Sequence, residues 1–422
     1  MKQNKRFILM FSVLLLLLWS QTTVALQQDG GPPRVGLFPD SPQYAMHGPY
    51  WVGTREFVIG ADTERPLATT MWYPAINPNF VPEEINYTYT PLLYRPVTVP
   101  GHAIAEAFPD FSGGPYPLVI FSHDNYMTRF AALYLTEHLA SQGFVVMAAQ
   151  RAGTGTGDTL YFTAQDVENV ANSLVYGPAD IQRQIDFATA LTAPDGTLSG
   201  LIDVEKSAVI GHATGADAAL TAAGARISLA SYQDWCNSVA DDPEITSGFD
   251  YYYNCVVYVG SEQRLLDMLG ATTQPGELWP EFDVKGVDAV ISLSTWNNLY
   301  EKGDLTGVTA PTLVIFGDMF PIDVQVNQTV YEKIASQQKA QIVFEHGAEA
   351  LTEEPCDSLQ EQNGYFICYQ EPIWDLNRSH DRVRHFATAF LLDTLKGDQD
   401  AHAALLAENV SFPGISYKTT MN

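Results

Sequence analysis

Continuous apolar runs alternate with amphipathic segments through the middle and C-terminal parts of the chain. The apolar runs cover residues 116–123, 144–150, 207–212, 287–294, 311–318 and 340–347. Helical spacing of apolar positions appears at 129–143, 178–192, from 215 onward, near 324–337 and at 380–397. Runs without polar alternation are typical of strands buried on both faces, and intervening helices supply the cover. The pattern therefore predicts an α/β fold with a mostly parallel sheet and helices on both faces.

Two regions depart from this rhythm. Residues 55–75, REFVIGADTERPLATTMWYPA, predict two antiparallel strands joined by a polar turn, and a Pro-rich, irregular stretch follows to Pro117. Between Ile227 and Lys285 the chain is aromatic and acidic, which we interpret as a cap insertion over one end of the sheet, residues 228–285. We divide the whole chain into a leader (1–25), a flexible N-terminal segment (26–49) and one α/β domain (50–422) that contains the cap.

The first residues have the pattern of an export signal. Lys2, Lys5 and Arg6 precede an apolar run from 7 to 19, and small residues lead to a cleavage site after Ala25. The apolar run is shorter than the roughly 20 residues of a membrane span, so a membrane anchor is the less favoured alternative. We expect a secreted or periplasmic protein without a stable membrane span after cleavage.

Cysteine and charge content limit the partners. Two local disulfides, Cys236 with Cys255 and Cys356 with Cys368, are the simplest of three possible pairings in an exported chain. The cysteine and histidine spacings lack the CxxC or HxxxH patterns of metal sites, so we expect no metal and no cofactor. The formal net charge of −27 argues against nucleic acid as a partner, and the sequence leaves the oligomeric state open.

The sharpest junction between a predicted strand and a predicted helix is the turn Gly211-His212-Ala213-Thr214-Gly215. Its two glycines satisfy the packing demand of the nucleophile elbow G-x-S-x-G, in which a tight turn presents a serine. Ala213 stands at the centre of this turn, so the turn offers no nucleophilic oxygen.

From about Tyr50 to Tyr417 the chain resembles secreted α/β-hydrolases of the dienelactone hydrolase-like group, related to platelet-activating-factor acetylhydrolases and polyester-cleaving cutinases. The stretches that carry the resemblance are RPLATTMWYPA, PLVIFSHD, ASQGFVVMAA, VIGHATGA, PTLVIFGD and HFATAFLLDTLKGDQDAHAALL. The resemblance implies an α/β-hydrolase fold and an esterase with a serine on the elbow. It also implies an acid after the next-to-last strand and a histidine after the last one.

Each of these catalytic positions is substituted here. The serine position is Ala213, the acid position is Phe320 and the histidine position is Glu349. The oxyanion position, whose backbone partner is Thr214, carries Asp124 instead of a glycine, and a carboxylate there opposes the developing negative charge. Because a serine relay needs hydroxyl, base and acid together, we expect a pseudo-esterase that retains a pocket for a small apolar or ester-like ligand.

Two alternative functions stay open. His346, Asp318 and Asp323 lie near the substituted positions, and displaced groups of this kind would make an active carboxylic ester hydrolase. A non-catalytic scaffold needs only surface contacts. Aromatic residues of the cap either hold a ligand or pack against the sheet: Tyr251, Tyr252, Tyr253, Trp279, Trp296 and Tyr300.

Some residues admit a second interpretation that we favour less. Ser122-His123 and the hydroxyl of Thr214 are candidate nucleophilic groups, although structural roles suit them better, as a structural cap suits His380. A set of four carboxylates could bind Ca²⁺, although solvated acids are expected in such an acidic protein: Asp124, Asp158, Asp318 and Glu349.

Overall fold

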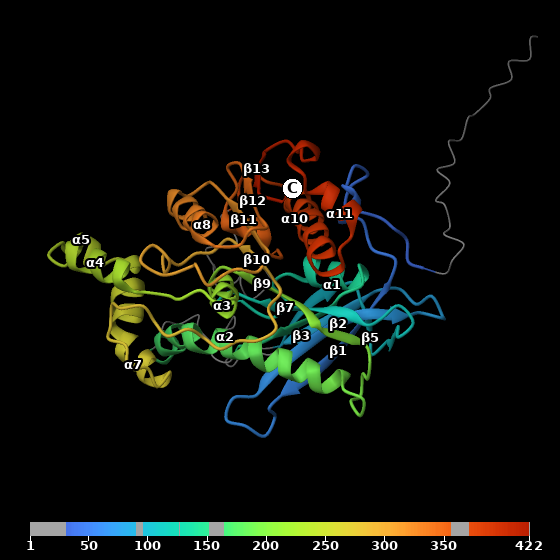
Figure 1. Cartoon of the computed structure of the whole chain (residues 1–422), viewed down its shortest axis with the longest axis horizontal. Helices are drawn as coiled ribbons and strands as arrows, with labels where there is room; N and C mark the ends of the chain where they lie inside the picture. Colours follow the sequence, from blue (N-terminus) through green and yellow to red (C-terminus); the bar gives the residue numbers. More distant parts are fainter. Residues whose placement is uncertain (1–30, 90–95, 126, 152–163, 356–370, 422) are drawn as a thin grey trace, which may run out of the picture.

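An eleven-stranded mixed sheet forms the centre of the molecule (Figure 1). The structure, a computed structural model, describes residues 31–89, 96–125, 127–151, 164–355 and 371–421. In spatial order the strands run β13-β12-β11-β10-β9-β7-β8-β2-β1-β5, and β6 pairs with β2. Their bounds are β1 (Trp51–Ile59), β2 (Leu67–Ile76), β5 (Ile104–Ala105), β6 (Phe108–Pro109), β7 (Tyr116–Ser122), β8 (Val145–Ala149), β9 (Ile202–His212), β10 (Ala289–Leu293), β11 (Thr312–Gly317), β12 (Lys339–Phe344) and β13 (Ile415–Thr419).

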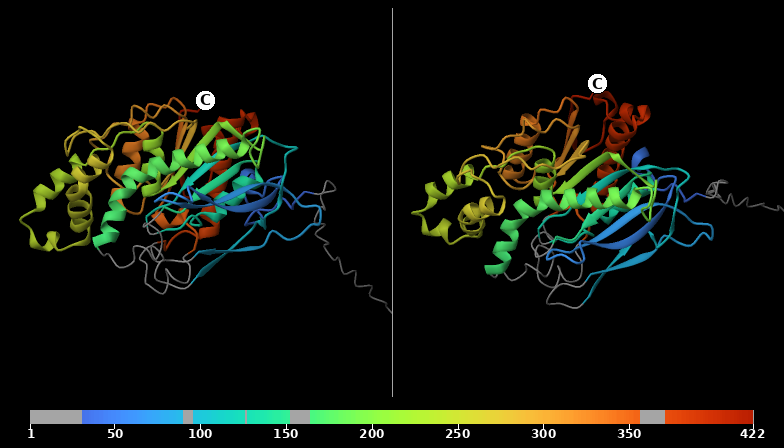
Figure 2. Two further views of the ribbon diagram at one scale, coloured as in Figure 1. Left: turned by 90° about the horizontal axis from the view of Figure 1, so that it is seen from below. Right: turned by 60° about the horizontal axis from the view of Figure 1, so that its bottom comes forward.

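Helices cover both faces of this sheet, as the sequence pattern predicts (Figure 2). Their bounds are α1 (Leu133–Ser141), α2 (Ala164–Thr192), α3 (Thr214–Ala222), α4 (Ala230–Val239), α5 (Pro243–Thr246), α6 (Phe249–Tyr251), α7 (Gly260–Met268), α8 (Pro321–Lys333), α10 (Leu376–Leu391) and α11 (Gln399–Ala404). Shorter helical turns are η1 (Gln43–Ala45), η2 (Tyr252–Val259), η3 (Glu349–Thr352), η5 (Leu392–Lys396) and η6 (Ala407–Asn409).

Alternating side chains of each central strand enter two separate cores. On β7, Leu118 and Ile120 pack in the core that contains α2 and α3. Val119 and Phe121 pack in the core that contains α1 and α10. Because successive residues of a strand point to opposite faces, a strand between two cores has to be apolar at every position. This requirement explains the unbroken apolar runs of the sequence.

The edges of the sheet differ in part from the sequence-based expectation. The hairpin predicted for residues 55–75 is present as β1 and β2, paired antiparallel with Ile59 opposite Leu67. The stretch interpreted as irregular up to Pro117 also contains a separate two-stranded ribbon, β3 (Ile85–Tyr89) with β4 (Val97–Gly101). The strand β13 closes the other edge by pairing antiparallel with β12. Short edge strands with mixed polarity lack the continuous apolar signal of the central ones, so the pattern did not predict them.

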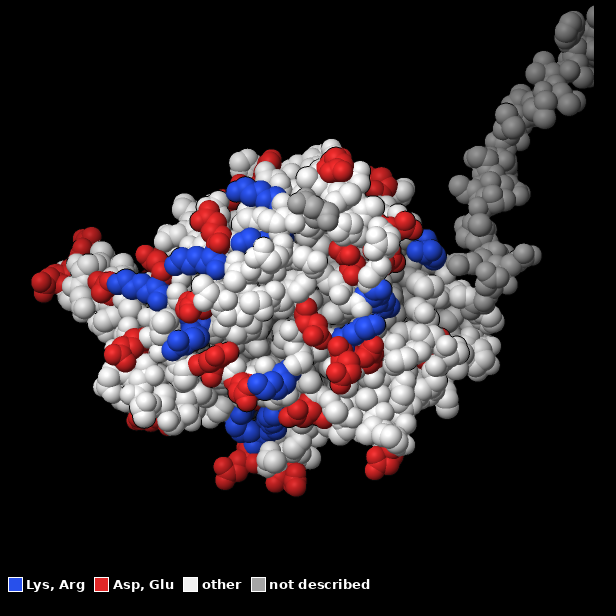
Figure 3. Space-filling model, viewed as in Figure 1, with Lys and Arg blue, Asp and Glu red and all other residues white. Residues whose placement is uncertain are grey.

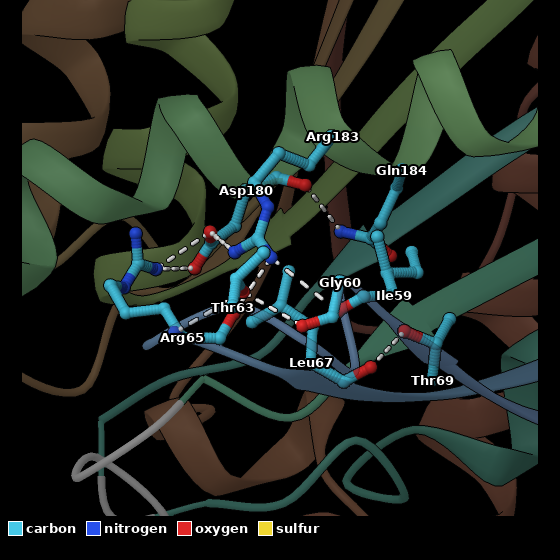
Figure 4. A network of polar contacts seen from close by, with 9 residues as sticks. All are labelled: Ile59, Gly60, Thr63, Arg65, Leu67, Thr69, Asp180, Arg183 and Gln184. Carbon is cyan, nitrogen blue, oxygen red and sulfur yellow. Dashed lines mark hydrogen bonds and ion pairs between the residues drawn. The ribbon is translucent and has the colours of Figure 1, made fainter.

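A polar network ties the turn between β1 and β2 to α2 (Figure 4). Arg65 Nη2 donates to both carboxylate oxygens of Asp180 at 2.7 Å, and Arg183 Nη1 donates to Asp180 Oδ1 at 3.1 Å. Arg183 also donates to the Arg65 carbonyl oxygen at 2.7 Å, so the two cations are held around one buried acid. Charge-assisted hydrogen bonds from these two arginines therefore tie α2 to the turn between β1 and β2.

The segment between α3 and β10 projects from one end of the sheet as helices α4, α5 and α7, at the left in Figure 1. The predicted disulfide between Cys236 and Cys255 is present and joins α4 to η2, with a Cα–Cα distance of 5.7 Å. The other predicted pair, Cys356 with Cys368, lies outside the described residues. In the part of the chain that the structure describes, no helix combines the length and the apolar character that crossing a membrane requires.

Charged side chains are mixed on the face shown in Figure 3. Lys and Arg side chains there lie beside Asp and Glu side chains instead of forming one basic surface. The whole chain has 49 acidic residues against 22 Lys and Arg. A nucleic-acid partner requires a continuous cationic surface, which this face does not offer.

The turn between β9 and α3 depends on the absence of side chains at its two glycines. A Cβ atom at Gly215 would lie 2.0 Å from the Ser122 carbonyl oxygen of β7. A Cβ atom at Gly211 would lie 2.1 Å from the Gly215 carbonyl oxygen. Both obstacles are backbone atoms, which cannot rotate away, so the close approach of strand, turn and helix requires glycine at both positions.

We predict that Gly215→Ala lowers the free energy of unfolding by about 2 kcal/mol or more, because the added methyl group must displace the backbone of β7. Urea unfolding followed by circular dichroism measures the change. Gly260→Ala is the matched control, since Gly260 has helical dihedrals and its Cβ would meet nothing closer than the Cys255 carbonyl oxygen at 3.4 Å. The control should be neutral or stabilise by up to about 1 kcal/mol. Equal stability of Gly215→Ala and the unmodified protein would contradict the packing argument.

Candidate active site

Ala213 occupies the tip of the β9–α3 turn, where the resemblance places a serine. Its backbone has φ 48° and ψ −113°, and its side chain is fully buried. Its N–H donates to the Leu293 carbonyl oxygen at 2.9 Å, which anchors the turn to β10. Positive φ is strained for a residue with a Cβ, by about 1–3 kcal/mol. The chain therefore holds a strained elbow that carries a methyl group instead of a hydroxyl group.

The carboxylate of Asp124 binds the N-terminus of the helix that follows this elbow. Thr214 donates its backbone N–H to Asp124 Oδ1 at 3.0 Å and its hydroxyl to the same oxygen at 2.7 Å. The backbone N–H of Asn125 donates to the Thr214 hydroxyl oxygen at 3.0 Å. The Thr214 N–H is the donor that would stabilise an oxyanion at this elbow, and a side chain of the protein already accepts it.

The surroundings of Asp124 set its charge. Burial raises the pKa of its carboxyl group to about 6, whereas the Thr214 hydrogen bonds and the charge of Arg151 act in the opposite direction. At neutral pH the group is therefore mainly ionised. A negative charge next to the elbow disfavours a second negative charge at the same position.

Glu349, at the position where the resemblance places a histidine, lies beside a second glutamate and a histidine. His212 Nδ1 is 3.4 Å from Glu353 Oε1, and His212 Nε2 is 4.0 Å from Glu349 Oε1. All three side chains are buried, and these four atoms have no hydrogen-bond partner among the described residues. Burial raises the pKa values of both glutamates well above their ordinary range and lowers that of His212 to about 3.

The acid position and its neighbours do not rebuild a relay. Phe320 precedes α8 and is 38% exposed. Asp318 accepts a hydrogen bond from the backbone N–H of His346, whose own side chain is exposed in the turn after β12. Asp323 is buried in the first turn of α8, where burial raises its pKa to about 6. Only Asp323 of these residues is close enough to act on the pKa of Glu349.

The remaining candidate groups make structural contacts. His123 Nδ1 lies 2.6 Å from the Asp124 carbonyl oxygen, and the backbone N–H of Arg151 donates to His123 Nε2 at 3.3 Å. His380 Nε2 lies 2.8 Å from the Glu353 carbonyl oxygen, and its ring stacks on Tyr134 at 3.7 Å. In the described ranges, no Ser or Thr hydroxyl group hydrogen-bonds to an imidazole nitrogen. The structure therefore brings no alternative hydroxyl and base together there.

A cavity of about 550 Å³ lies between the cap and the carboxyl end of the sheet. Tyr232, Trp235 and Tyr253 line it from the cap, Trp296 from the loop after β10, and Ile322 from the first turn of α8. The loop after β10 also contributes Asn297 to the cavity lining. This loop is bonded to α3, the helix that follows the elbow, because Asn297 Nδ2 donates to Asp217 Oδ2 at 2.7 Å.

Of the aromatic residues singled out in the sequence, Tyr253 and Trp296 line this cavity. Trp279 and Tyr300 are buried and bonded elsewhere: Trp279 Nε1 donates to Glu262 Oε1 at 3.0 Å, and the Tyr300 hydroxyl donates to the Asp217 carbonyl oxygen at 3.1 Å. Those two residues therefore belong to the packing of cap and sheet.

Glu353 was not predicted from the sequence to belong to this site. It stands four residues after Glu349 and lies just beyond the short η3 turn, in extended backbone, so the spacing alone does not place the two side chains together. That spacing is the one available signal, and it is common among acidic residues. Of the four carboxylates considered for Ca²⁺, Asp124 and Glu349 are close enough for their charges to interact, Asp318 instead accepts the His346 N–H, and Asp158 lies outside the described residues.

Comparison with known proteins gives a structural likeness. The solved structure of a ferulic acid esterase from Streptomyces cinnamoneus aligns over 92% of this chain and 99% of that chain, with a TM-score of 0.55 and 17% sequence identity. No protein-family model matches the sequence, and no curated protein matches it either. At this level of identity the likeness concerns the fold alone, and the chain has an α/β-hydrolase fold with a disulfide-containing cap.

We predict that Asp124→Asn gains stability relative to the unmodified protein as the pH rises from 4 to 7.5. The carboxyl group of an Asp in an unfolded chain has a pKa of about 3.9. In the folded chain burial raises the pKa of Asp124 to about 6. A carboxyl group whose pKa is higher in the folded state than in the unfolded state stabilises the folded protein at low pH. This stabilisation is lost as the pH rises through the pKa of the folded state. The Asn side chain of the variant does not titrate. The Tm of Asp124→Asn minus the Tm of the unmodified protein should therefore increase between pH 4 and pH 7.5.

Circular dichroism melts at half-unit pH steps provide this measurement. Thr214→Ala is the companion variant: it removes a hydroxyl donor that lowers the pKa of Asp124, so the midpoint of the pH dependence should move upward. If the difference in Tm between Asp124→Asn and the unmodified protein does not change with pH, the pKa of Asp124 is not raised in the folded protein, and the prediction is wrong.

Proposed function

We propose that this chain is an exported α/β-hydrolase-fold protein that does not hydrolyse esters through a serine relay and that binds a small ligand in its cap cavity. The observation that carries the first part is the contact of Asp124 Oδ1 with the Thr214 N–H at 3.0 Å. The export pattern of residues 1–25 and the Cys236–Cys255 disulfide support export, because disulfides persist in oxidising compartments.

The bound carboxylate opposes ester hydrolysis in two ways. The carbonyl oxygen of a reacting ester must come within about 3 Å of the oxyanion donors, and Asp124 Oδ1 already occupies that distance from Thr214. Displacing it would leave a buried carboxylate without two of its hydrogen bonds, and the two negative charges would still repel each other. Since Ala213 has no hydroxyl group, an acyl intermediate cannot form on the elbow either.

The cavity suits a ligand with a flat ring. Its lining combines the rings of Tyr232, Trp235, Tyr253 and Trp296 with the amide group of Asn254. Aromatic walls with a few polar groups bind aromatic or sugar rings, because stacking supplies contact area and amides fix orientation. The structural neighbour is a ferulic acid esterase, so we choose a ferulate ester as the first ligand to test.

We predict that the purified mature chain hydrolyses methyl ferulate and p-nitrophenyl acetate no faster than buffer. The fourfold variant Asp124→Gly, Ala213→Ser, Phe320→Asp and Glu349→His should show ester cleavage above that background. The threefold variant that retains Asp124 is its matched control, and it should be about 10²–10³-fold slower, the usual effect of losing an oxyanion donor. Turnover by the unmodified chain, or equal rates in the two variants, would contradict the proposal.

We also predict that methyl ferulate binds the unmodified chain in isothermal titration calorimetry and that Trp296→Ala weakens this binding about tenfold. Loss of one aromatic contact is worth about 0.5–1.5 kcal/mol beyond the lost contact area. Trp296→Phe should retain most of the affinity, and Trp374→Phe, outside the cavity, should leave it unchanged. Absence of binding, or equal binding in Trp296→Ala, would count against the cavity and leave the scaffold alternative.

A further inference from the structure

We propose that His212, Glu349 and Glu353 form a binding site for a transition-metal dication of the Zn²⁺ type. Each residue offers one ligand atom, and the three atoms lie within 4.8 Å of one another. Two ligands that are each about 2.1 Å from one ion at the tetrahedral angle are about 3.4 Å apart. His212 Nδ1 and Glu353 Oε1 are separated by 3.4 Å, which fits two ligands of one ion, whereas Glu349 Oε1 lies 4.0 Å from the opposite ring nitrogen and would have to move toward that ion.

The missing hydrogen bonds of these groups are the second observation. His212, Glu349 and Glu353 are 1%, 7% and 2% exposed, so water contributes little to their solvation. Both ring nitrogens and one oxygen of each glutamate have no hydrogen-bond partner among the described residues. A buried polar atom without a partner costs about 1–3 kcal/mol, and more when it is charged. One cation between the three side chains would satisfy an atom of each and neutralise most of their charge.

The surrounding fold holds the three ligands in place. His212 ends β9, one residue before the elbow, whereas Glu349 begins η3 and Glu353 directly follows it. The backbone of η3 is fixed from outside, since the hydroxyl of Tyr134 donates to the Thr352 carbonyl oxygen at 2.9 Å. The Ser379 hydroxyl likewise donates to the Leu351 carbonyl oxygen at 2.9 Å. Ligands supported by such outer contacts lose little freedom when an ion binds.

The ligand set selects the class of ion. Imidazole nitrogen with carboxylate oxygen suits Zn²⁺ and its first-row neighbours, whereas Ca²⁺ takes six to eight oxygen ligands. Both ring nitrogens of His212 lack a hydrogen-bond partner among the described residues, so a ring lone pair is available to an ion. This site differs from the Ca²⁺ set considered from sequence, which lacks His212 and Glu353 and includes Asp318.

An ion at this position would connect the elbow to the loop where the resemblance places the catalytic histidine. It would bind the folded protein and not the unfolded chain, so it would raise the Tm with its concentration. This inference does not depend on ligand binding in the cap cavity, and each is tested separately.

The experiment uses the tag-free mature protein, because polyhistidine binds the same ions. We expect elemental analysis of the purified protein to find about one equivalent of zinc or a neighbouring metal. After treatment with a chelator, ZnCl₂ should raise the Tm by several degrees, and CaCl₂ should not. Calorimetric titration with ZnCl₂ should show a single tight site. A protein whose Tm and calorimetric titration do not respond to ZnCl₂ would overturn the proposal.

Variants locate the ion. Glu353→Gln and Glu349→Gln should each weaken zinc binding by at least about 100-fold, exceeding the 10- to 100-fold typical of outer contacts. Glu262→Gln replaces a buried glutamate that bonds Trp279 and Gly276, and it should bind zinc normally. Cobalt substitution adds a visible absorption band that reports nitrogen and oxygen ligation, and His212→Asn should change this band even if stability is unaffected. Zinc binding that persists unchanged in all three ligand variants would place the ion elsewhere and overturn the proposal.

Discussion

The hydrogen bonds from Thr214 to Asp124 connect the loop after β7 to the N-terminus of α3, and the chemistry of the elbow depends on them. A helix N-terminus attracts negative charge, because its first N–H groups lack partners within the helix. In a serine hydrolase this positive potential stabilises the oxyanion that forms during the reaction. Here Asp124 Oδ1 accepts both the N–H and the hydroxyl of Thr214, at 3.0 and 2.7 Å. The same electrostatic feature here stabilises the contact between the Asp124 carboxylate and the start of α3.

Around that contact the chain has the backbone arrangement of an α/β-hydrolase fold. Ala213 keeps the strained backbone of an elbow, and the flanking glycines keep strand and helix in contact. Strain of this kind persists only where the surrounding packing enforces it. Glu349 meets His212 and Glu353 in a buried cluster whose three ligand atoms lie within 4.8 Å of one another, and there we propose a cation. The cap cavity lies at the same end of the sheet, lined by the cap, the loop after β10 and the start of α8, and it provides space for a ligand.

The fold could be predicted from the sequence because burial on both faces leaves a continuous apolar signal in β7 to β12. The Cys236–Cys255 disulfide was predicted because its cysteines are close in sequence within one segment. The assignment of Ala213, Phe320 and Glu349 to the positions of a serine, an acid and a histidine rests on the resemblance, and it stays a prediction. Asp124 and Thr214 were assigned to the same oxyanion position, but the hydrogen bonds between them were not predicted, and neither was the contact of Glu353 with His212. These pairs are set by loop geometry and by packing between distant segments, which no local pattern records.

The most direct measurement of the central claim is the amide resonance of Thr214 in protein labelled with ¹⁵N-threonine, followed by TROSY spectra from pH 4.5 to 8. If Asp124 accepts this N–H, the resonance should move downfield with a midpoint near about 6, the pKa that burial gives the carboxyl group. In Asp124→Asn the resonance should stay still. If the Thr214 amide resonance of the unmodified protein does not shift with pH and its proton exchanges rapidly with solvent, the N–H is not bonded to Asp124. That result would contradict this account.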